Sequence, residues 1–252
     1  MIKALILFVA FLAVELACGG LSRLVGMSQG VTVLLPNVLV LFYMLWWRRL
    51  TPQTERLETS RRQGANLWIA VLGVMLVLLV WVNFLLEALG LPDWTKDMDI
   101  EALYSDWVFV VAAVLVGPVA EEMVFRMGMI DAMESSKSEV VRGWAVALAA
   151  VLFAVAHFNP AQSAGALLLG LFFGWVYVRT RSLALPIACH ILNNGASILW
   201  AHLAGFDYTL EELALKPYKL WAVVVAGAII VAVFLIGLDK MFSNAEARRQ
   251  EV

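Results

Sequence analysis

The sequence predicts an all-α protein that crosses a membrane several times. Of its 252 residues, 62% are hydrophobic and only 15% are charged, whereas soluble domains are about half apolar and a quarter charged. A helix needs about 20 largely apolar residues to cross a bilayer. Eight segments meet or approach that length, so we predict a bundle of eight transmembrane helices: residues 3–22, 30–47, 66–90, 106–127, 142–158, 162–179, 183–204 and 217–238.

The first three spans are apolar runs without a polar motif. Lys3 followed by an apolar run resembles a signal peptide. However, Glu15 stands where a lipoprotein cleavage site would have an aliphatic residue, so we expect the first helix to be retained. Pro36 lies inside the second span, where neighbouring helices can satisfy the carbonyl that a proline leaves unpaired. Cys18 and Cys189 both fall in apolar segments, so the spacing indicates neither a disulfide nor a metal site.

The loops between the spans alternate in charge, and this alternation predicts the topology. Basic residues are concentrated after spans 2, 4 and 6 and in the tail: Arg48, Arg49, Arg56, Arg61, Arg62, Lys137, Arg142, Arg179, Arg181, Lys240, Arg248 and Arg249. The other loops hold few, and Lys96 stands among acids at positions 93, 97, 99 and 101. Because lysine and arginine favour the cytoplasmic side, both termini are predicted to be cytoplasmic, which agrees with an even number of spans.

Nothing in the sequence indicates a second structural unit. We find no soluble domain and no repeat of fixed period, so residues 1–252 are predicted to form a single integral membrane domain. Polar motifs are confined to a core at 106–204, with accessory helices at 1–90 and 217–238. A net charge of −2 gives no sign of a nucleic-acid partner. Short loops without a targeting signal suggest the plasma membrane of a bacterium.

Two adjacent acids, Glu121 and Glu122, lie in the fourth span, and Arg126 follows one helical turn later. Ionisable groups at bilayer depth cost about 2.5–3.5 kcal/mol each on insertion scales, so they are rarely placed there without a function. Since residues i and i+4 share one face of a helix, Glu122 can pair with Arg126 while Glu121 points to a different surface. A carboxylate near a cation in such an interior suits a general base. A salt bridge that only packs helices together would explain the same residues without chemistry.

Two further polar pairs have the same i,i+4 spacing. Phe153 and His157 end the fifth span immediately before a turn, which makes His157 available to a cavity. A structural histidine would also fit that place. His190 and Asn194 share a face of the seventh span, with Asn193 beside them. Such side chains can stabilise a developing oxyanion in acyl transfer, although hydrogen bonds between helices, worth about 1 kcal/mol or less each, would use them too.

The order EExxxR, FxxxH and HxxxN on the core helices of an eight-span protein resembles the CPBP family. These are the CAAX-processing and bacteriocin-processing intramembrane endopeptidases, which include the eukaryotic prenyl-protein endopeptidase. All three motifs match without a gap, within a stretch of roughly residues 106–204. The resemblance implies a glutamate-dependent peptidase that requires neither a cofactor nor a metal.

The resemblance also assigns six catalytic-site residues: Glu121, Glu122, Arg126, His157, His190 and Asn194. The first glutamate of the motif would act with His157 to activate a water molecule. His190 and Asn194 would hold the oxyanion of the tetrahedral intermediate, and the second glutamate and the arginine would organise the base. The residues alone do not rank one glutamate above the other, so that assignment rests on the resemblance.

We expect helices 4, 5 and 7 to enclose the site in a water-filled cavity that opens to the cytoplasmic side. His157 lies at the nominally outer end of span 5, away from the depth of Glu121. The two side chains can meet only if that span is sunk or tilted, or if the turn after it lies inside the protein. Non-helical backbone is tolerated there only where it is buried in protein or lines water.

Two other functions remain open. A zinc peptidase would use His157, His190 and a glutamate as three ligands and leave the fourth position open, although no HExxH motif is present. A non-enzymatic transporter or bacteriocin-immunity scaffold would use the buried polar groups to relay protons or to hold helices together. The expected partners are the lipid bilayer and, for a peptidase, a membrane-associated, leader or CAAX-type peptide.

Overall fold

The computed structural model describes residues 1–50, 63–204 and 217–250, and within these ranges it is a bundle of helices without strands. The prediction of an all-α membrane bundle is confirmed. The helices are α1 (Ile2–Leu24), α2 (Gln29–Leu50), α3 (Ala65–Leu89), η2 (Trp94–Asp97), α4 (Ile100–Ser105), α5 (Trp107–Val111), η3 (Ala112–Val116), α6 (Gly117–Glu122), η4 (Met123–Ile130), α7 (Asp131–Glu134), α8 (Glu139–Gly143), α9 (Ala145–Val155), α10 (Pro160–Thr180), α11 (Ala184–Ala204) and α12 (Pro217–Gln250).

Six helices in the described chain are long and apolar enough to cross a membrane: α1, α2, α3, the continuous helix Trp107–Glu134, α10 and α12. The count of eight is not confirmed. The helix α9 has only 11 residues, which at 1.5 Å per residue gives about 16 Å, roughly half a bilayer core. The helix α11 has 21 residues, but His190 and the two asparagines after it make it less apolar than the six.

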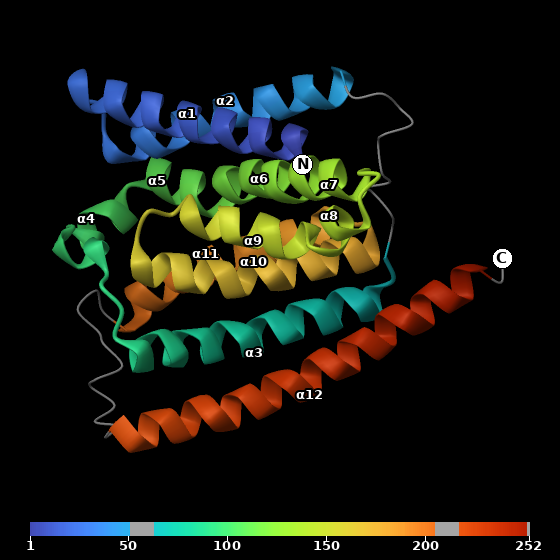
Figure 1. Ribbon diagram of the computed structural model, residues 1–252. Helices are drawn as coiled ribbons and strands as arrows, with labels where there is room; N and C mark the ends of the chain where they lie inside the picture. The colour runs from blue at the N-terminus through green and yellow to red at the C-terminus, as the bar shows by residue number, and fades with distance from the viewer. Residues whose placement is uncertain (51–62, 205–216, 251–252) are drawn as a thin grey trace.

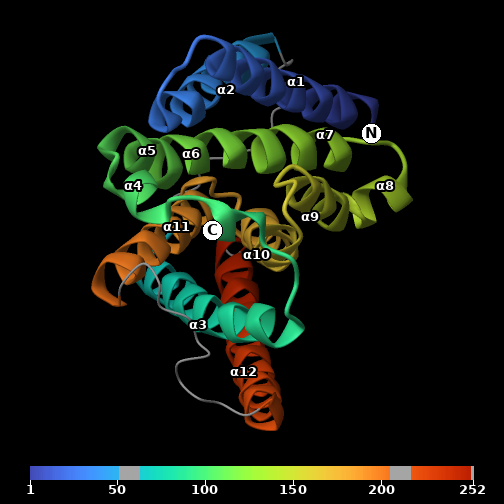
Figure 2. The ribbon, with the colours of Figure 1, turned by 90° about the vertical axis from the view of Figure 1, so that its left-hand side faces the viewer.

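The long helix Trp107–Glu134 occupies the middle of the bundle. In Figure 1, α1 and α2 lie above it, α9, α10 and α11 lie below it, and α3 and α12 follow further down. Figure 2 shows the same order from one end, with α4 close to the start of the central helix. The central helix therefore has packed neighbours on both sides, and this position explains why every residue of η4 is buried.

Two stretches of the central helix are π-helical, and they flank the acidic pair. In the first, η3, the N–H of Gly117 donates to the carbonyl of Ala112, five residues back. In that register the carbonyl of Ala113 would pair with residue 118, but Pro118 has no N–H to give. The carbonyl of Ala113 is thus free for a side chain from another helix. π-Helical turns are frequent at functional sites for this kind of reason.

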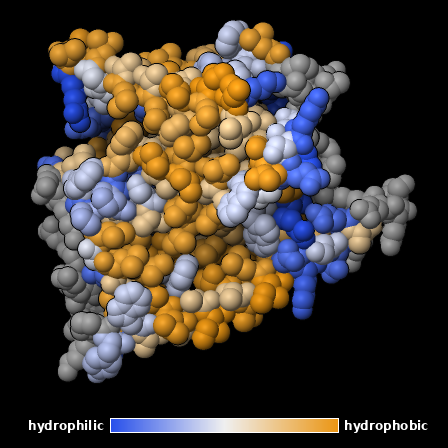
Figure 3. Space-filling view, in the orientation of Figure 1, coloured by the Kyte–Doolittle hydropathy of each residue, from blue (hydrophilic) through white to orange (hydrophobic). Residues whose placement is uncertain are grey.

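The two ends of the bundle differ in charge, and we name them for what they carry. The basic end holds Arg48, Arg181 and the α7–α8 segment, and Arg181 forms an ion pair with Glu134 at 2.6 Å there. The α4 end holds residues 90–106 and the start of α2, where the Asp106 carboxylate accepts a bond from the N–H of Gly30 at 3.1 Å. Only a glycine fits at position 30, because a Cβ would collide with the Asp106 carboxylate. Hydrophobic side chains cover the middle of the face in Figure 3, and hydrophilic ones gather towards its two sides.

The short length of α9 places the turn after it within the bundle. Phe158 adopts the left-handed conformation, with φ of 51°, which costs energy for a bulky residue and needs support from its surroundings. That support comes from the α4 end: Asn159 donates a hydrogen bond to Asp93 at 2.8 Å, and the N–H of Ala161 donates to the carbonyl of Pro92 at 3.1 Å. Loop 90–97 therefore holds the turn that carries His157.

Candidate active site

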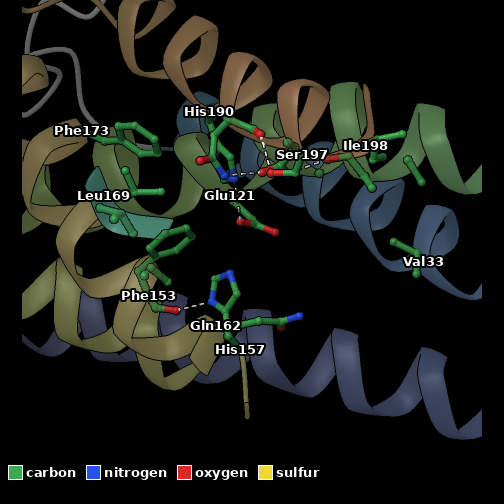
Figure 4. Close-up of a pocket in the computed structure, with 18 of the residues that line it drawn as sticks. Val33, Glu121, Phe153, His157, Gln162, Leu169, Phe173, His190, Ser197 and Ile198 are labelled. Carbon is green, nitrogen blue, oxygen red and sulfur yellow. Dashed lines mark hydrogen bonds and ion pairs between the residues drawn. The ribbon is translucent and has the colours of Figure 1, made fainter. Parts of the chain in front are cut away.

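The three polar motifs meet at one cavity of about 450 Å³, a size typical of small-molecule and peptide sites. Glu121, Phe153, His157, His190 and Asn194 all line it. In the close-up of Figure 4 the carboxylate of Glu121 and the rings of His157 and His190 face the same space. The fold thus brings together residues from three separate helices and one turn. The first and last of them, Glu121 and Asn194, are 73 positions apart in the sequence.

Glu122 and Arg126 lie behind the cavity wall and form a closed, buried network. The Nε of Arg126 lies 2.9 Å from Glu122 Oε2, and the two side chains are 1% and 0% exposed. The other carboxylate oxygen of Glu122 lies 3.0 Å from His190 Nδ1. Arg126 also lies over the rings of Phe153 and Phe173, at 4.8 and 5.4 Å from their centres. A buried ion pair needs this degree of satisfaction, because desolvating two charges is costly.

Glu121 is the acid that faces the cavity. Its side chain is 24% exposed, whereas that of Glu122 is fully buried. His190 Nε2 lies 3.8 Å from Glu121 Oε2, which is too long for a direct hydrogen bond. The one-residue offset turns the two carboxylates about 100° apart on the helix. One of them can therefore meet a ligand while the other is fully engaged within the protein.

His157 is fixed by the backbone of its own helix. Its Nδ1 lies 2.8 Å from the carbonyl oxygen of Phe153, and its ring packs edge-on against the Phe153 ring with centroids 4.8 Å apart. A carbonyl only accepts, so Nδ1 must carry the proton in this contact. In the neutral ring, Nε2 is then a proton acceptor. The i,i+4 spacing of FxxxH places these two groups on one face.

Asn194 anchors α11 to the central helix. Its Nδ2 donates to the carbonyl of Ala113 at 2.8 Å, the carbonyl that Pro118 leaves without a backbone partner. Its Oδ1 accepts from Asn193 Nδ2 at 3.0 Å. A primary amide has two N–H groups, so Asn194 retains a second donor beside the cavity. The asparagine thus has a structural contact in addition to any contact with a ligand.

More helices line the cavity than the three expected from the sequence. Asn37 from α2, Asn83 from α3 and Gln162 from α10 also contribute, together with Ser197 of α11. Asn37 is 5% exposed, and its Oδ1 has no hydrogen-bond partner among the described residues. The only sequence signal for it was one polar residue in an apolar span. Tyr104 of α4 lines the cavity as well, and burial, followed by the charge of Asp93, raises the pKa of its hydroxyl, which stays protonated at neutral pH.

The direction of the cavity differs from the expectation. We expected an opening towards the cytoplasmic side, where the basic loops lie. The lining residues that are exposed, Asn83, Gln162 and Ser197, instead lie towards the α4 end. The basic end is closed because every residue of η4, from Met123 to Ile130, is buried.

No metal centre is evident in the described ranges 1–50, 63–204 and 217–250, where no three histidine, cysteine or acidic side chains gather as a set of ligands. His190 and the two glutamates come closest, but Glu122 is already bound to Arg126. Of the ligands named for the zinc alternative, His190 contacts Glu122 through Nδ1, while His157 and Glu121 face the cavity.

The comparisons with known proteins agree with the geometry. The family described as Type II CAAX prenyl endopeptidase Rce1-like matches residues 103–196, a stretch that runs from α4 through most of α11 and contains all three motifs. The search of curated proteins and the search of solved structures find no match. The central part of the chain is therefore similar to this family of CAAX prenyl endopeptidases, and together with the apolar helices the match supports a membrane protease.

Proposed function

We propose that the protein is a glutamic-type intramembrane endopeptidase, in which Glu121 and His157 activate a water molecule to hydrolyse a peptide bond. The observation that carries this proposal is the pairing of two proton acceptors on one cavity. Glu121 offers a carboxylate that faces the cavity, with His190 Nε2 at 3.8 Å, too far for a direct hydrogen bond. His157 offers Nε2, because its Nδ1 proton is held by the carbonyl of Phe153. A water molecule has two protons to donate, and two acceptors would orient it with a lone pair towards a substrate carbonyl.

The geometry supports Glu121 over Glu122 as the general base. A base has to reach the proton that it removes, and Glu121 is the exposed member of the pair. Glu122 is fully buried, and its two oxygens contact Arg126 and His190. Its role in the proposal is to hold His190, with Arg126 balancing its charge.

The proposed oxyanion hole consists of His190 and Asn194. His190 would donate a hydrogen bond from Nδ1–H to Glu122 and, as the imidazolium, would present an Nε2–H group to the cavity. Asn194 would supply its second amide N–H, and its bond to Ala113 fixes the orientation of the group. Fixed donors aimed at developing negative charge give the largest electrostatic contribution in acyl transfer.

The reaction would proceed by attack of water oxygen on the carbonyl carbon while one water proton passes to Glu121. The carbonyl oxygen becomes the oxyanion held by His190 and Asn194. When the tetrahedral intermediate collapses, the C–N bond breaks and the amine nitrogen takes the proton from Glu121. The products are an amine and a carboxylic acid, which loses its remaining proton to solvent, and the carboxylate of Glu121 is restored for the next cycle.

The test is replacement of Glu121 by Gln in the full-length protein, which removes the base and keeps the shape. Comparative membrane proteomics of cells with either form should show cleavage products in the wild type that are absent from the variant. Equal cleavage in both, with equal protein levels, would contradict the assignment and favour a non-enzymatic scaffold. Chelator treatment of the purified protein addresses the zinc alternative: activity that is lost and then restored by Zn²⁺ would favour a metallopeptidase.

A further inference from the structure

One wall of the cavity forms where α2 packs against the central helix. From α2 this wall receives Val33, which Figure 4 labels, and Asn37, one helical turn further on. From the central helix it receives Ala112, Ala113 and Gly117. The central helix thus contributes only small residues here, and Asn37 supplies the polar side chain of this wall.

Asn37 lies close to Glu121 along the central helix. A Cβ added at Gly117 would lie 3.7 Å from both amide atoms of Asn37, so the amide is directly beside that glycine. Gly117 and Glu121 are four residues apart and share one face of the helix. The rise of 1.5 Å per residue separates them by about 6 Å along the axis, which corresponds to about two residues of an extended peptide. All three residues line the cavity, so Asn37 is within reach of a peptide that is bound at Glu121.

The amide of Asn37 is buried and only half satisfied. The residue is 5% exposed, and its Nδ2 donates to the carbonyl of Val33 at 2.8 Å. A carbonyl only accepts, so this bond fixes which amide atom points towards Val33. The other atom, Oδ1, has no hydrogen-bond partner among the described residues. Of the described residues that line the cavity, Asn37 alone carries a buried side-chain oxygen or nitrogen in this state.

A buried acceptor in the opposite half of the bundle is filled from within the protein. Phe153, Phe173 and His190 form the floor of the cavity and are 5% exposed or less. Beyond the floor, towards the basic end, every residue of η4 is buried, and we call this part the sealed half. There the carboxylate of Asp131 accepts from the hydroxyl of Tyr177 at 2.8 Å. Leaving a buried acceptor unpaired costs free energy, so an unpaired one beside a cavity indicates a partner that arrives with a ligand.

The unpaired acceptor complements the donors on the other side of the cavity. Asn194 lines the cavity and retains a second amide N–H beside its bond to Ala113. The proposed oxyanion hole therefore supplies donors to a substrate carbonyl. An extended peptide also carries backbone N–H groups, and these need acceptors when the peptide is buried in a site. Asn37 Oδ1 offers such an acceptor.

We propose that Asn37 is a substrate-binding residue, whose Oδ1 accepts a hydrogen bond from a backbone N–H group next to the scissile peptide group. This inference rests on the proposed peptidase function and names a residue that fixes the register of its substrate. It also adds α2 to the site, outside the residues 103–196 that match the family. The substrate residue that supplies this N–H cannot be proline, because proline has no N–H. The site thus selects an extended segment without proline at that position.

The test is steady-state cleavage by the purified full-length protein of a fluorogenic peptide that carries a Glu121-dependent cleavage sequence. Asn37→Leu removes the acceptor, and Asn37→Thr removes it but keeps a hydroxyl that can bond the Val33 carbonyl. Thr32→Val is the matched control, because Thr32 bonds the carbonyl of Ser28 at 2.9 Å on the same helix but does not line the cavity. The N–H is present in substrate and transition state alike, so both Asn37 variants should raise KM with little change in kcat. Loss of one hydrogen bond corresponds to about a 2- to 13-fold rise, and Thr32→Val should leave KM unchanged.

Thermal unfolding separates this role from a structural one. Asn37→Leu replaces an unpaired buried polar group by an apolar one of similar shape, so the unfolding midpoint should stay the same or rise. A lower midpoint in both Asn37 variants with unchanged KM would overturn the inference and make Asn37 a structural residue. A fall in kcat at constant KM would overturn it too, because Asn37 would then act in the chemical step.

Two depsipeptides identify the bonded group, each with an ester oxygen in place of the N–H on one side of the scissile peptide group. With one of them, wild type and Asn37→Leu should have the same KM, because the group that Asn37 binds is absent. A difference between the two proteins that persists with both depsipeptides would overturn the proposal. If cleavage depends on Glu121 but KM is unchanged in both Asn37 variants, only this inference fails. If no cleavage depends on Glu121, the peptidase function fails and the role of Asn37 falls with it.

Discussion

The bundle has two halves, one towards the α4 end and one towards the basic end. Both contain ionisable side chains, but these face a cavity in the first half and are buried in the second. In the first, Glu121 and His157 face a cavity and retain unused acceptor atoms. In the second, Glu122 and Arg126 are buried and bound to each other. The boundary falls between two consecutive residues of one helix. A turn of about 100° per residue is therefore sufficient to separate a reactive carboxylate from a structural one.

The two halves differ in whether their charged groups pair within the protein, and not in the types of residue that they contain. Both contain acids, a cationic or titratable partner and aromatic rings; Phe153 contacts both groups, since Arg126 and His157 pack on its ring. Where the charged groups pair with one another inside the protein, as Glu122 does with Arg126, they stabilise the fold and are not available to a ligand. Where acceptors face a cavity, they are available for water and substrate.

The largest expected effect comes from His157→Ala, which removes one acceptor from the cavity. General acid–base groups contribute about 10²–10⁴-fold to rate, so cleavage should fall by that factor. The free energy of unfolding should change little, because the ring is partly exposed and bonds the Phe153 carbonyl near the end of its own helix. Steady-state cleavage assays and thermal unfolding in detergent measure the two quantities, with Ser135→Ala as a control far from the cavity. Cleavage at the wild-type rate would remove His157 from the mechanism.

The second prediction concerns the sealed half. Arg126→Ala leaves the fully buried carboxylate of Glu122 without its cation, and such a change typically destabilises by about 3–5 kcal/mol. The double variant Glu122→Leu with Arg126→Leu should recover most of that loss, since apolar residues often replace a buried ion pair at little cost. It should not recover cleavage, because His190 loses the carboxylate that holds its Nδ1. Thermal unfolding and cleavage assays on both variants test this, and full activity in the double variant would contradict the role given to Glu122.

Much of the site could be predicted from the sequence because the residues of each motif lie close together on a single helix. Each i,i+4 motif indicated which side chains share a helical face, and each of the three motifs contributes at least one residue to the cavity lining. Contacts between different helices could not be predicted from the sequence. The bond from His190 to Glu122 links residues 68 positions apart, and the bond from Asn194 to Ala113 depends on a π-helical register that Pro118 exposes. No periodicity encodes either contact.

The sequence also did not explain how His157 reaches the same depth in the bundle as Glu121. The short length of α9 explains it. A span predicted over 142–158 would carry His157 to the far side of a membrane, but α9 has only 11 residues, after the separate short helix α8. The sequence is continuously apolar from Gly143 to Ala156, so the break between the two helices at Trp144 gave no hydropathy signal. The eight-span count stays a prediction for the same reason, because hydropathy does not separate a crossing helix from a short buried one.

A smaller effect is expected where the halves meet, at Gly170 of α10. An added Cβ would lie 3.1 Å from Phe153 Cδ1 and 3.3 Å from the backbone of Ala150. Overpacking of this kind costs about 1–3 kcal/mol, and a displaced Phe153 would move the carbonyl that fixes His157, so Gly170→Ala should lower both stability and cleavage. Gly73→Ala in α3 is the matched control, because a Cβ there meets nothing within 4 Å. Equal behaviour of the two variants would show that the contact between α9 and α10 does not position His157.

The smallest effect should come from Tyr177→Phe, deep in the sealed half. The Tyr177 hydroxyl donates to Asp131 at 2.8 Å, and both residues are buried. Loss of one intramolecular hydrogen bond costs about 0.5–1.5 kcal/mol, so the unfolding midpoint should fall slightly while the cleavage rate per folded molecule stays at the wild-type value. Arg181 and Glu134 pair nearby and should limit any opening of this end. A fall in cleavage that exceeds the loss of folded protein would mean that the two halves are coupled, and that the sealed half takes part in the reaction rather than only supporting the floor of the cavity.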